Sequence, residues 1–111
     1  MTPDSFDLIL DHQINTCINV LQSKAEQYAS DSDRLFNFKL AAKLQDTTLT
    51  KALAGMMAKH TVSIYEMISS GERYSHELWL EKITDNINYL ILLRAVLGEE
   101  DQRFPREDTD A

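Results

Sequence analysis

Acidic side chains follow one side of a predicted helix near the end of the chain. Glu77, Glu81 and Asp85 are spaced four residues apart, and Asn88 follows them. At helical spacing, these side chains form one narrow stripe. Like charges at this spacing repel each other by roughly a few tenths of a kcal/mol per pair. The stripe must therefore either be covered by solvent or be compensated by a cation.

The second half of the same helix is apolar on nearly every side, as in a helix buried in a bundle or at a dimer interface. A helical-wheel count at about 100° per residue places Leu92 inside the acidic band. The far end of the band is therefore predicted to meet another helix. Two interpretations remain open, a metal-binding stripe or a solvated face whose end touches a neighbour. The broad face beside the band consists of Leu80, Ile83, Ile87, Leu90, Ile91, Arg94 and Leu97.

Carboxylates at this spacing suit a hard divalent cation. Mg²⁺ takes oxygen ligands in octahedral geometry, commonly about two carboxylates together with water and phosphate oxygens. Glu81 and Asp85 are the candidate ligands, and Glu66 is a third candidate on the preceding predicted helix. Glu66 can reach the pair if the two helices pack antiparallel, which the short connection at 71–74 favours. The alternative for Glu66 is a surface position.

Positive charges that could meet a phosphate lie in the first half of the chain and at its centre. Lys59 either contacts a phosphate or extends to solvent. Its neighbour His60 is more typical of a hydrogen-bonded core residue than of a catalyst. Around the first loop, Lys24, Arg34 and Lys39 lie near aromatic residues that are either core or a flat surface for a base. The candidate substrate-binding residues are Lys24, Lys39, Lys59 and Asn88.

The charge of the chain limits its partners. The chain has 111 residues, a length that predicts one domain with a hydrophobic core. Its formal net charge is −7. Nonspecific nucleic-acid binding requires clustered Lys and Arg, so we expect no nucleic-acid partner. A free nucleotide is a different case, because one divalent cation can bridge carboxylates and phosphates.

Sparse glycine and proline predict helices joined by short loops. There are 3 glycines and 2 prolines, and no alternating strand pattern. The pattern predicts an all-α bundle of four helices at about 3–28, 35–44, 49–70 and 76–97. The run Asp46-Thr47-Thr48 and Ser75 are predicted caps, and Gly71 and Gly98 are predicted stops. Gly55 lies inside the third helix, which suggests close approach of another backbone.

The remaining segments carry fewer signals. Residues 1–97 are predicted to form the domain, and 98–111 an acidic, flexible tail. The lone Cys17 lies among apolar residues at helical spacing and is read as a small buried hydrophobe. There is no signal-peptide pattern, and no apolar run approaches the roughly 18 residues of a membrane span. We therefore expect a cytoplasmic protein without a membrane partner.

Four short motifs carry a resemblance to a known class. They are Lys24-Ala25-Glu26-Gln27-Tyr28, then Asn37-Phe38-Lys39 with Ala41-Ala42, then the run from Ala52 to Lys59, and the run from Glu81 to Tyr89. Over about residues 24 to 93, the chain resembles small phage and prophage-encoded helical proteins grouped with the MazG-like nucleoside triphosphate pyrophosphohydrolases.

The resemblance implies a dimeric four-helix bundle that holds Mg²⁺ on acidic residues of two neighbouring helices. The metal would bind a triphosphate and activate water for attack. Glu81 and Asp85 match the second acidic motif of the class in character, although the usual spacing is Glu-x-x-Asp and here it is Glu-x-x-x-Asp. The first motif, Glu-Glu-x-x-Glu, is missing, and the third helix offers Lys59, His60 and Glu66 in its place.

Two functional hypotheses follow from different classes. The first is Mg²⁺-dependent binding of a nucleoside triphosphate, with hydrolysis to monophosphate and pyrophosphate as the implied reaction. The second is a noncatalytic dimeric interaction or structural protein of phage or prophage origin, in which Glu81 and Asp85 pair with Lys or Arg of a neighbouring helix. Under both hypotheses, a homodimer through the fourth helix is expected. A carboxylate cluster in an open cleft favours the first, and salt-bridged carboxylates without a cleft favour the second.

Overall fold

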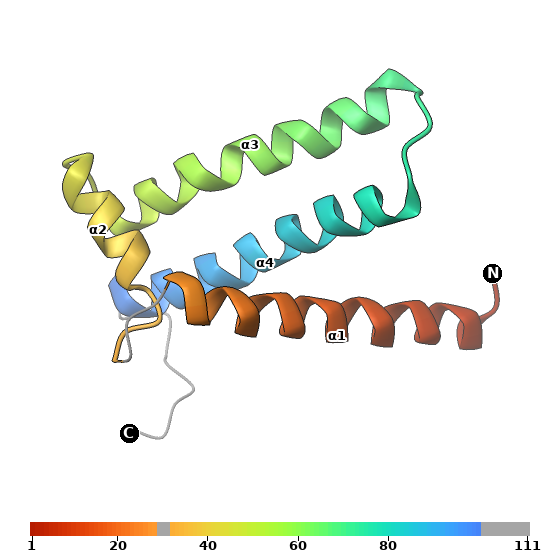
Figure 1. The fold of residues 1–111 in the computed structure, drawn as a ribbon, viewed down its shortest axis with the longest axis horizontal. Helices are drawn as coiled ribbons and strands as arrows, with labels where there is room; N and C mark the ends of the chain where they lie inside the picture. Colours follow the sequence, from red (N-terminus) through yellow and green to blue (C-terminus); the bar gives the residue numbers. More distant parts are fainter. Residues whose placement is uncertain (29–31, 101–111) are drawn as a thin grey trace.

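The computed structural model describes residues 1–28 and 32–100, and this part of the chain is all-helical (Figure 1). It contains α1 (Pro3–Tyr28), α2 (Phe36–Leu44), α3 (Leu49–Ser70) and α4 (His76–Glu100). No strand is present among these residues. The predicted all-α architecture and the positions of its four helices are confirmed.

Helix α4 is the central element of the bundle, with α1 on one side and α3 on the other (Figure 1). The short connection at 71–75 reverses the chain, so α3 and α4 are antiparallel, as predicted. Helix α1 runs in the same direction as α4. The short α2 packs against α3 near the C-terminal end of α4. Residues from all four helices therefore meet around the middle and the C-terminal half of α4.

Local capping residues set most helix ends. The Thr48 hydroxyl accepts a hydrogen bond of 3.1 Å from the Lys51 amide, and Ser75 Oγ accepts one of 3.1 Å from Leu78. These bonds satisfy amides that have no partner inside the helix. Gly71 ends α3 with a φ of 70°, in the left-handed region that favours glycine. The predicted boundaries at Gly71 and Ser75 are confirmed, and within the predicted cap run of residues 46–48 the structure selects Thr48.

The hydrophobic core lies where α2, α3 and the C-terminal half of α4 meet. Leu53 and Val96 are both 0% exposed at its centre. Leu92 packs against this core, which confirms that the far end of the acidic band meets other helices. The remaining residues of the cluster are Leu35, Phe38 and Leu49, with Met56, Tyr89 and Leu93 packed against them.

The predicted stop at Gly98 is wrong, because α4 continues to Glu100. The Glu100 carboxylate accepts hydrogen bonds from the backbone amide and the hydroxyl of Thr50, in the first turn of α3. An anion at this position satisfies an unpaired amide and interacts favourably with the positive end of the helix dipole. This contact holds the last turn of α4 against α3. The rest of the predicted tail, residues 101–111, lies outside the described residues.

The predicted close approach at Gly55 is also wrong. A Cβ placed on Gly55 meets no atom within 4 Å among the described residues. The position is exposed on α3. Since no neighbouring backbone requires a glycine there, the residue only lowers the helix propensity of α3.

We therefore expect Gly55→Ala to raise the free energy of unfolding by about 0.5–1 kcal/mol, because alanine restricts the unfolded chain and fits the helix. The matched control is Gly71→Ala, which places a side chain at a φ of 70° and should lower the free energy of unfolding. Urea denaturation of both variants tests this expectation. A stability loss in Gly55→Ala would contradict it.

None of the helices in the described part of the chain combines the length and the apolar character that a membrane span requires.

Candidate functional site

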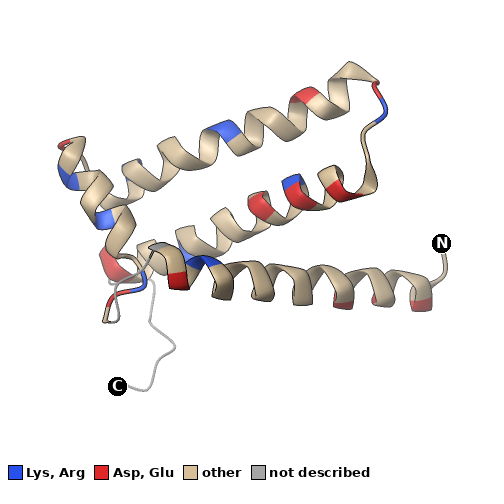
Figure 2. Ribbon diagram, viewed as in Figure 1, with Lys and Arg blue, Asp and Glu red and all other residues tan. Residues whose placement is uncertain are grey.

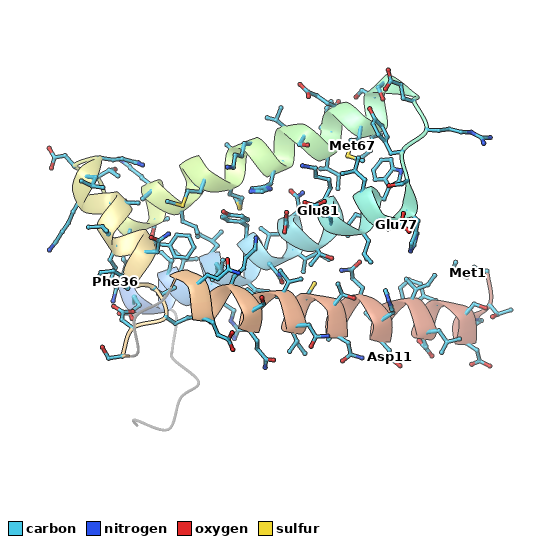
Figure 3. The ribbon with its side chains drawn as sticks, in the orientation of Figure 1. Met1, Asp11, Phe36, Met67, Glu77 and Glu81 are labelled. Atoms are coloured by element: carbon cyan, nitrogen blue, oxygen red, sulfur yellow. The ribbon has the colours of Figure 1, made fainter. Side chains whose placement is uncertain are left out.

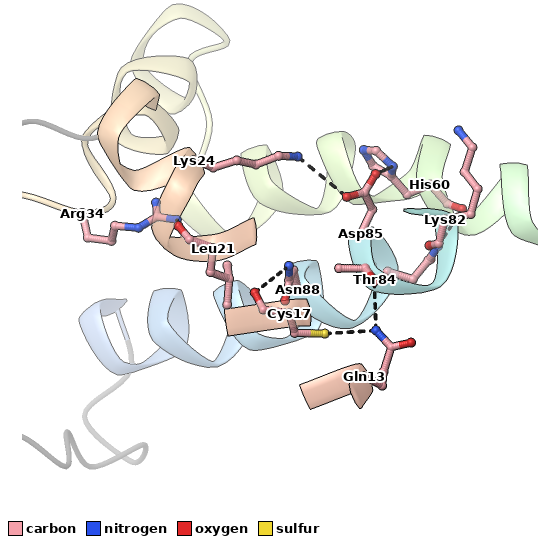
Figure 4. A network of polar contacts seen from close by, with 11 residues as sticks. Gln13, Cys17, Leu21, Lys24, Arg34, His60, Lys82, Thr84, Asp85 and Asn88 are labelled. Carbon is pink, nitrogen blue, oxygen red and sulfur yellow. Dashed lines mark hydrogen bonds and ion pairs between the residues drawn. The ribbon is translucent and has the colours of Figure 1, made fainter. Parts of the chain in front are cut away.

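Asp85 lies at the centre of a junction between α1, α3 and α4 (Figure 4). Its side chain is only 14% exposed. One carboxylate oxygen lies 3.7 Å from Nζ of Lys24 on α1, and the other lies 3.8 Å from Nδ1 of His60 on α3. The acidic stripe is therefore not uniformly solvated, because its last carboxylate points into a contact between three helices.

The other two acids of the stripe border an open groove between α1 and α4. Glu77 and Glu81 are exposed, and both lie on the N-terminal half of α4 (Figure 3). With Asp85 they line a cavity of about 360 Å³, which we call the acidic groove. Its other lining residues are Thr16, Val20, Lys24, Leu80 and Thr84. The structure thus places three carboxylates and one ammonium group on a common opening.

A second cavity, of about 290 Å³, lies beside Asp85 and is formed by residues from α1, α2, α3, α4 and the segment before α2. Three cations line it, Lys24, Arg34 and Lys59, and no described lining residue is a carboxylate. We call it the basic pocket. The other lining residues are Leu21, Asn37, Phe38, Met56, His60, Tyr89 and Leu92. This concentration of positive charge is unusual in a chain with a net charge of −7. Three cations on one cavity give the pocket a positive electrostatic potential.

Lys24 lines both cavities, so it separates the acidic groove from the basic pocket. The Lys24 side chain is 46% exposed, and its ammonium group lies beside Asp85 (Figure 4). The contact is a partly solvated ion pair at long distance, which contributes little to stability. Lys24 can therefore turn toward a ligand at small cost.

Backbone contacts position the walls of the basic pocket. Nη2 of Arg34 donates a hydrogen bond of 3.3 Å to the carbonyl oxygen of Leu21, which ties the segment before α2 to α1 (Figure 4). Nδ2 of Asn86 donates to the carbonyl oxygens of His60 and Lys82, at 3.1 and 2.7 Å. The bond to the His60 carbonyl links α4 to α3, whereas the bond to Lys82 lies within α4. These bonds hold two walls of the pocket in place, and none of them involves the Lys59 side chain.

His60 stacks on Tyr89 inside the basic pocket. The ring centroids are 4.8 Å apart and the planes are inclined by 30°. Burial lowers the pKa of His60 below its usual value of 6.5, and Lys59, Lys82 and Lys24 lower it further. Asp85 acts in the opposite direction and raises the pKa. The imidazole is therefore neutral at pH 7, and protonation would add a fourth positive charge to the pocket.

A lowered pKa in the folded protein means that the unfolded chain binds more protons at His60. The stability associated with neutral His60 is fully present above a pH of about 6.5 and is lost as the pH falls through the folded pKa. We expect the free energy of unfolding to decrease across this range more steeply in the parent than in His60→Gln. Urea denaturation at several pH values measures both slopes. Equal slopes would contradict the expectation.

Of the other predicted site residues, some line the basic pocket and some lie outside both cavities. Lys59 lines the basic pocket, as does Lys24. Lys39 instead donates a hydrogen bond of 2.7 Å to Asp33 and lies 3.5 Å from Glu99, and the bond to Asp33 raises the pKa of Lys39. Glu66 is exposed on α3, and neither cavity beside Asp85 includes it among its lining residues.

Asn88 is buried in the contact between α1 and α4 rather than in either cavity. Its Nδ2 donates a hydrogen bond of 3.3 Å to the carbonyl oxygen of Cys17, and its Oδ1 has no partner among the described residues. Nearby, Nε2 of Gln13 donates to the hydroxyl of Thr84 at 2.8 Å. These polar contacts hold α1 against α4 (Figure 4). Cys17 is buried in this contact, as predicted.

The described residues contain no group of three or more His, Cys, Asp and Glu side chains arranged to hold a metal ion. Glu81 and Asp85 remain as two carboxylates on the acidic groove. Two carboxylates with water and phosphate oxygens are a common Mg²⁺ environment in nucleotide complexes. The donor set therefore fits a metal that arrives with a phosphorylated ligand better than a metal held by protein alone.

The site contains one feature that the noncatalytic hypothesis requires and one that the nucleotide hypothesis requires. Asp85 pairs with Lys24 of a neighbouring helix, which the noncatalytic hypothesis requires. The same two residues also line an open groove, which the nucleotide hypothesis requires. Sequence reasoning did not single out Tyr89, and it treated Arg34 only as one of several charges near the first loop. Their roles depend on contacts between elements that are distant in the chain.

Comparison of the chain with protein-family models, with curated proteins and with solved structures found no match.

Proposed function

We propose that this protein is a MazG-like nucleotide-binding protein that takes up a nucleoside triphosphate, together with Mg²⁺, at the paired acidic groove and basic pocket. The observation that carries the proposal is the basic pocket itself. Lys24, Arg34 and Lys59 converge on one cavity of an acidic protein, directly beside a carboxylate. A polyphosphate binds several Lys and Arg side chains through charged hydrogen bonds. It can also lie beside a carboxylate when a divalent metal binds both groups.

The shape and lining of the cavities support a nucleotide rather than a simple inorganic anion. The two cavities, of about 360 and 290 Å³, are near the lower end of the roughly 300–1,000 Å³ range of small-molecule sites. They adjoin at Lys24. Beyond the cations, Tyr89, Phe38 and Met56 give the basic pocket an aromatic and apolar wall for a base or sugar.

Each side chain has a distinct part in this proposal. Arg34 is anchored on the carbonyl oxygen of Leu21 and presents its remaining donors to a phosphate. Lys59 supplies a mobile point charge. Glu81 and Asp85 would hold Mg²⁺, and the metal would supply charge neutralisation between carboxylates and phosphates. Lys24 would leave Asp85 and turn to the ligand.

The reaction that the resemblance implies is hydrolysis of the triphosphate to monophosphate and pyrophosphate. In that reaction the cations of the basic pocket would stabilise the charge that accumulates on the phosphate oxygens. Binding and hydrolysis are separate parts of the proposal. Release of pyrophosphate from a panel of ribonucleoside and deoxyribonucleoside triphosphates tests the second part directly.

The deciding experiment is a titration of the four common nucleoside triphosphates, with and without Mg²⁺, by calorimetry and thermal shift. We expect at least one nucleotide to bind and to stabilise the parent, with tighter binding in the presence of Mg²⁺. In Asp85→Ala the effect of Mg²⁺ should disappear. The absence of binding by every nucleotide tested, under both conditions, would refute the proposal.

A further inference from the structure

We propose that the groove between the N-terminal halves of α1 and α4 is a docking site for a basic amphipathic helix of a partner protein. A cavity of about 410 Å³ lies there, and we call it the apolar groove. Most of its lining residues are aliphatic or aromatic, and none of them is proposed to hold metal or phosphate. The lining consists of Leu8, Ile9, His12 and Gln13 of α1 and His76, Trp79, Leu80 and Ile83 of α4.

The apolar groove exists because α1 and α4 separate toward their N-terminal ends (Figure 1). The helices touch further along, where Gln13 donates a hydrogen bond to the hydroxyl of Thr84. Among the described elements, α1 packs mainly against α4. Leu8 and Ile9 of the groove therefore remain 72% and 51% exposed. This side of the bundle leaves room for one further helix.

The length of the apolar groove suits about two turns of a helix. Its lining extends over residues 8–13 of α1 and residues 76–83 of α4, which is about 10 Å along α4 at about 1.5 Å per residue. When an amphipathic helix binds in a groove, its apolar side chains at positions i, i+3 or i+4 and i+7 enter the groove. Positions i and i+7 are also about 10 Å apart. The groove therefore matches the apolar stripe of one helix.

The charges of the two groove-forming segments indicate that the polar face of the partner is basic. Residues 1–23 contain three acids and neither Lys nor Arg, and the acids are Asp4, Asp7 and Asp11. Residues 76–83 add Glu77 and Glu81 against the single cation Lys82. Figure 2 shows the predominance of acids in these two segments. The resulting negative potential attracts the Lys and Arg side chains of a partner.

The same charges disfavour other occupants of an apolar groove. A second copy of the chain would bring another acidic helix pair against the first, and like charges repel across an interface. The acids also repel an anionic membrane and the phosphate backbone of a nucleic acid. Of these occupants, only a basic helix combines apolar contact inside the groove with opposite charge around it.

Binding of a synthetic peptide tests the proposal. The probe is a peptide of about 15 residues, long enough to form a helix, with leucines at positions i, i+3, i+4 and i+7 and lysines elsewhere. One control peptide has the same composition in scrambled order, and another carries glutamate in place of lysine. We expect only the probe to bind the full chain at micromolar concentration. Binding should shift the fluorescence of Trp79, the single tryptophan of the chain, to shorter wavelength, because the probe covers the indole.

Paired substitutions on α1 test whether the probe occupies the apolar groove. The double variant Leu8→Ala and Ile9→Ala removes apolar groups from the groove and should weaken probe binding at least about tenfold. The matched control is Leu10→Ala with Ile14→Ala, which truncates side chains that are 44% and 48% exposed on the same helix but do not line the groove. The control should change the affinity by less than about twofold. Circular dichroism verifies that each variant is helical.

A second pair of double variants tests the contribution of charge. Asp7→Asn with Glu77→Gln should weaken probe binding roughly fivefold at low salt. Glu26→Gln with Glu66→Gln removes two charges from other exposed positions and should have a smaller effect. Failure of the probe to bind, equal binding of the scrambled peptide, or equal losses in test and control variants would overturn the proposal. A Trp79 shift with anionic lipid vesicles would identify a membrane surface instead and would also overturn it. These titrations contain no nucleotide, so their outcome is independent of the proposed function.

Discussion

The double variant Arg34→Gln and Lys59→Gln is expected to weaken binding of nucleoside triphosphate by at least about 100-fold. Each substitution removes a charged hydrogen-bond donor from the basic pocket. A hydrogen bond to a charged group contributes about 1.5–3 kcal/mol, or roughly ten- to more than 100-fold in affinity for each donor. The two donors share one ligand, so their effects need not add. Isothermal titration of parent and variant in the same buffer measures the loss.

Substitutions elsewhere on α3 and α2 separate this effect from a general change in charge. Lys51→Gln and Lys43→Gln also remove two positive charges, but from exposed positions that do not line the basic pocket. Their double variant should bind nucleotide with an affinity within about twofold of the parent, because exposed charges at a distance are screened by salt. If both double variants lose affinity equally, the ligand responds to net charge and the basic pocket is not its site.

The largest expected effect on stability is that of Leu53→Ala, which should lower the free energy of unfolding by about 3 kcal/mol, within a range of about 2–5. Leu53 is 0% exposed and lies in the core cluster with Phe38 and Val96. The truncation removes buried methyl groups and leaves a cavity that rigid helices close only partly. Urea denaturation measures the change, and an unaltered m-value indicates that the comparison is valid.

Leu44→Ala is the matched control, because Leu44 is 80% exposed at the end of α2. Its free energy of unfolding should remain within about 0.5 kcal/mol of the parent. Phe38 and Met56 border both the core and the basic pocket, so Leu53→Ala should also weaken nucleotide binding. A loss below 1 kcal/mol in Leu53→Ala would show that the core does not lie where α2, α3 and α4 meet.

The sequence determined the helices and most of their ends. Thr48, Gly71 and Ser75 mark boundaries that the structure confirms, because a cap bonds to amides within one turn of itself and a left-handed residue is a local requirement. The antiparallel pairing of α3 and α4 followed from a short connection for the same local reason. Leu92, inside the acidic band, correctly indicated that this side of α4 meets other helices.

The predictions at Gly55 and Gly98 are wrong, because each outcome depends on residues distant in the chain. Gly55 has open space around it, although a glycine inside a helix suggested a close backbone. Gly98 does not end α4, because Glu100 bonds to Thr50 at the start of α3 and stabilises the additional turn. Lys39 was grouped with Lys24 and Lys59, and it lies instead between Asp33 and Glu99.

Only the tertiary structure decided which polar residues share a site. Lys24, Arg34, Lys59 and Tyr89 come from α1, the segment before α2, α3 and α4, and no short spacing in the sequence relates them. Helix propensity and capping act within a few residues, whereas the position of a side chain relative to another helix depends on packing angle and offset. The sequence therefore determined four helices and an acidic stripe. The tertiary structure alone decided that Asp85 lies against Lys24 and His60 rather than in solvent, because packing against α1 and α3 surrounds that one position of the stripe.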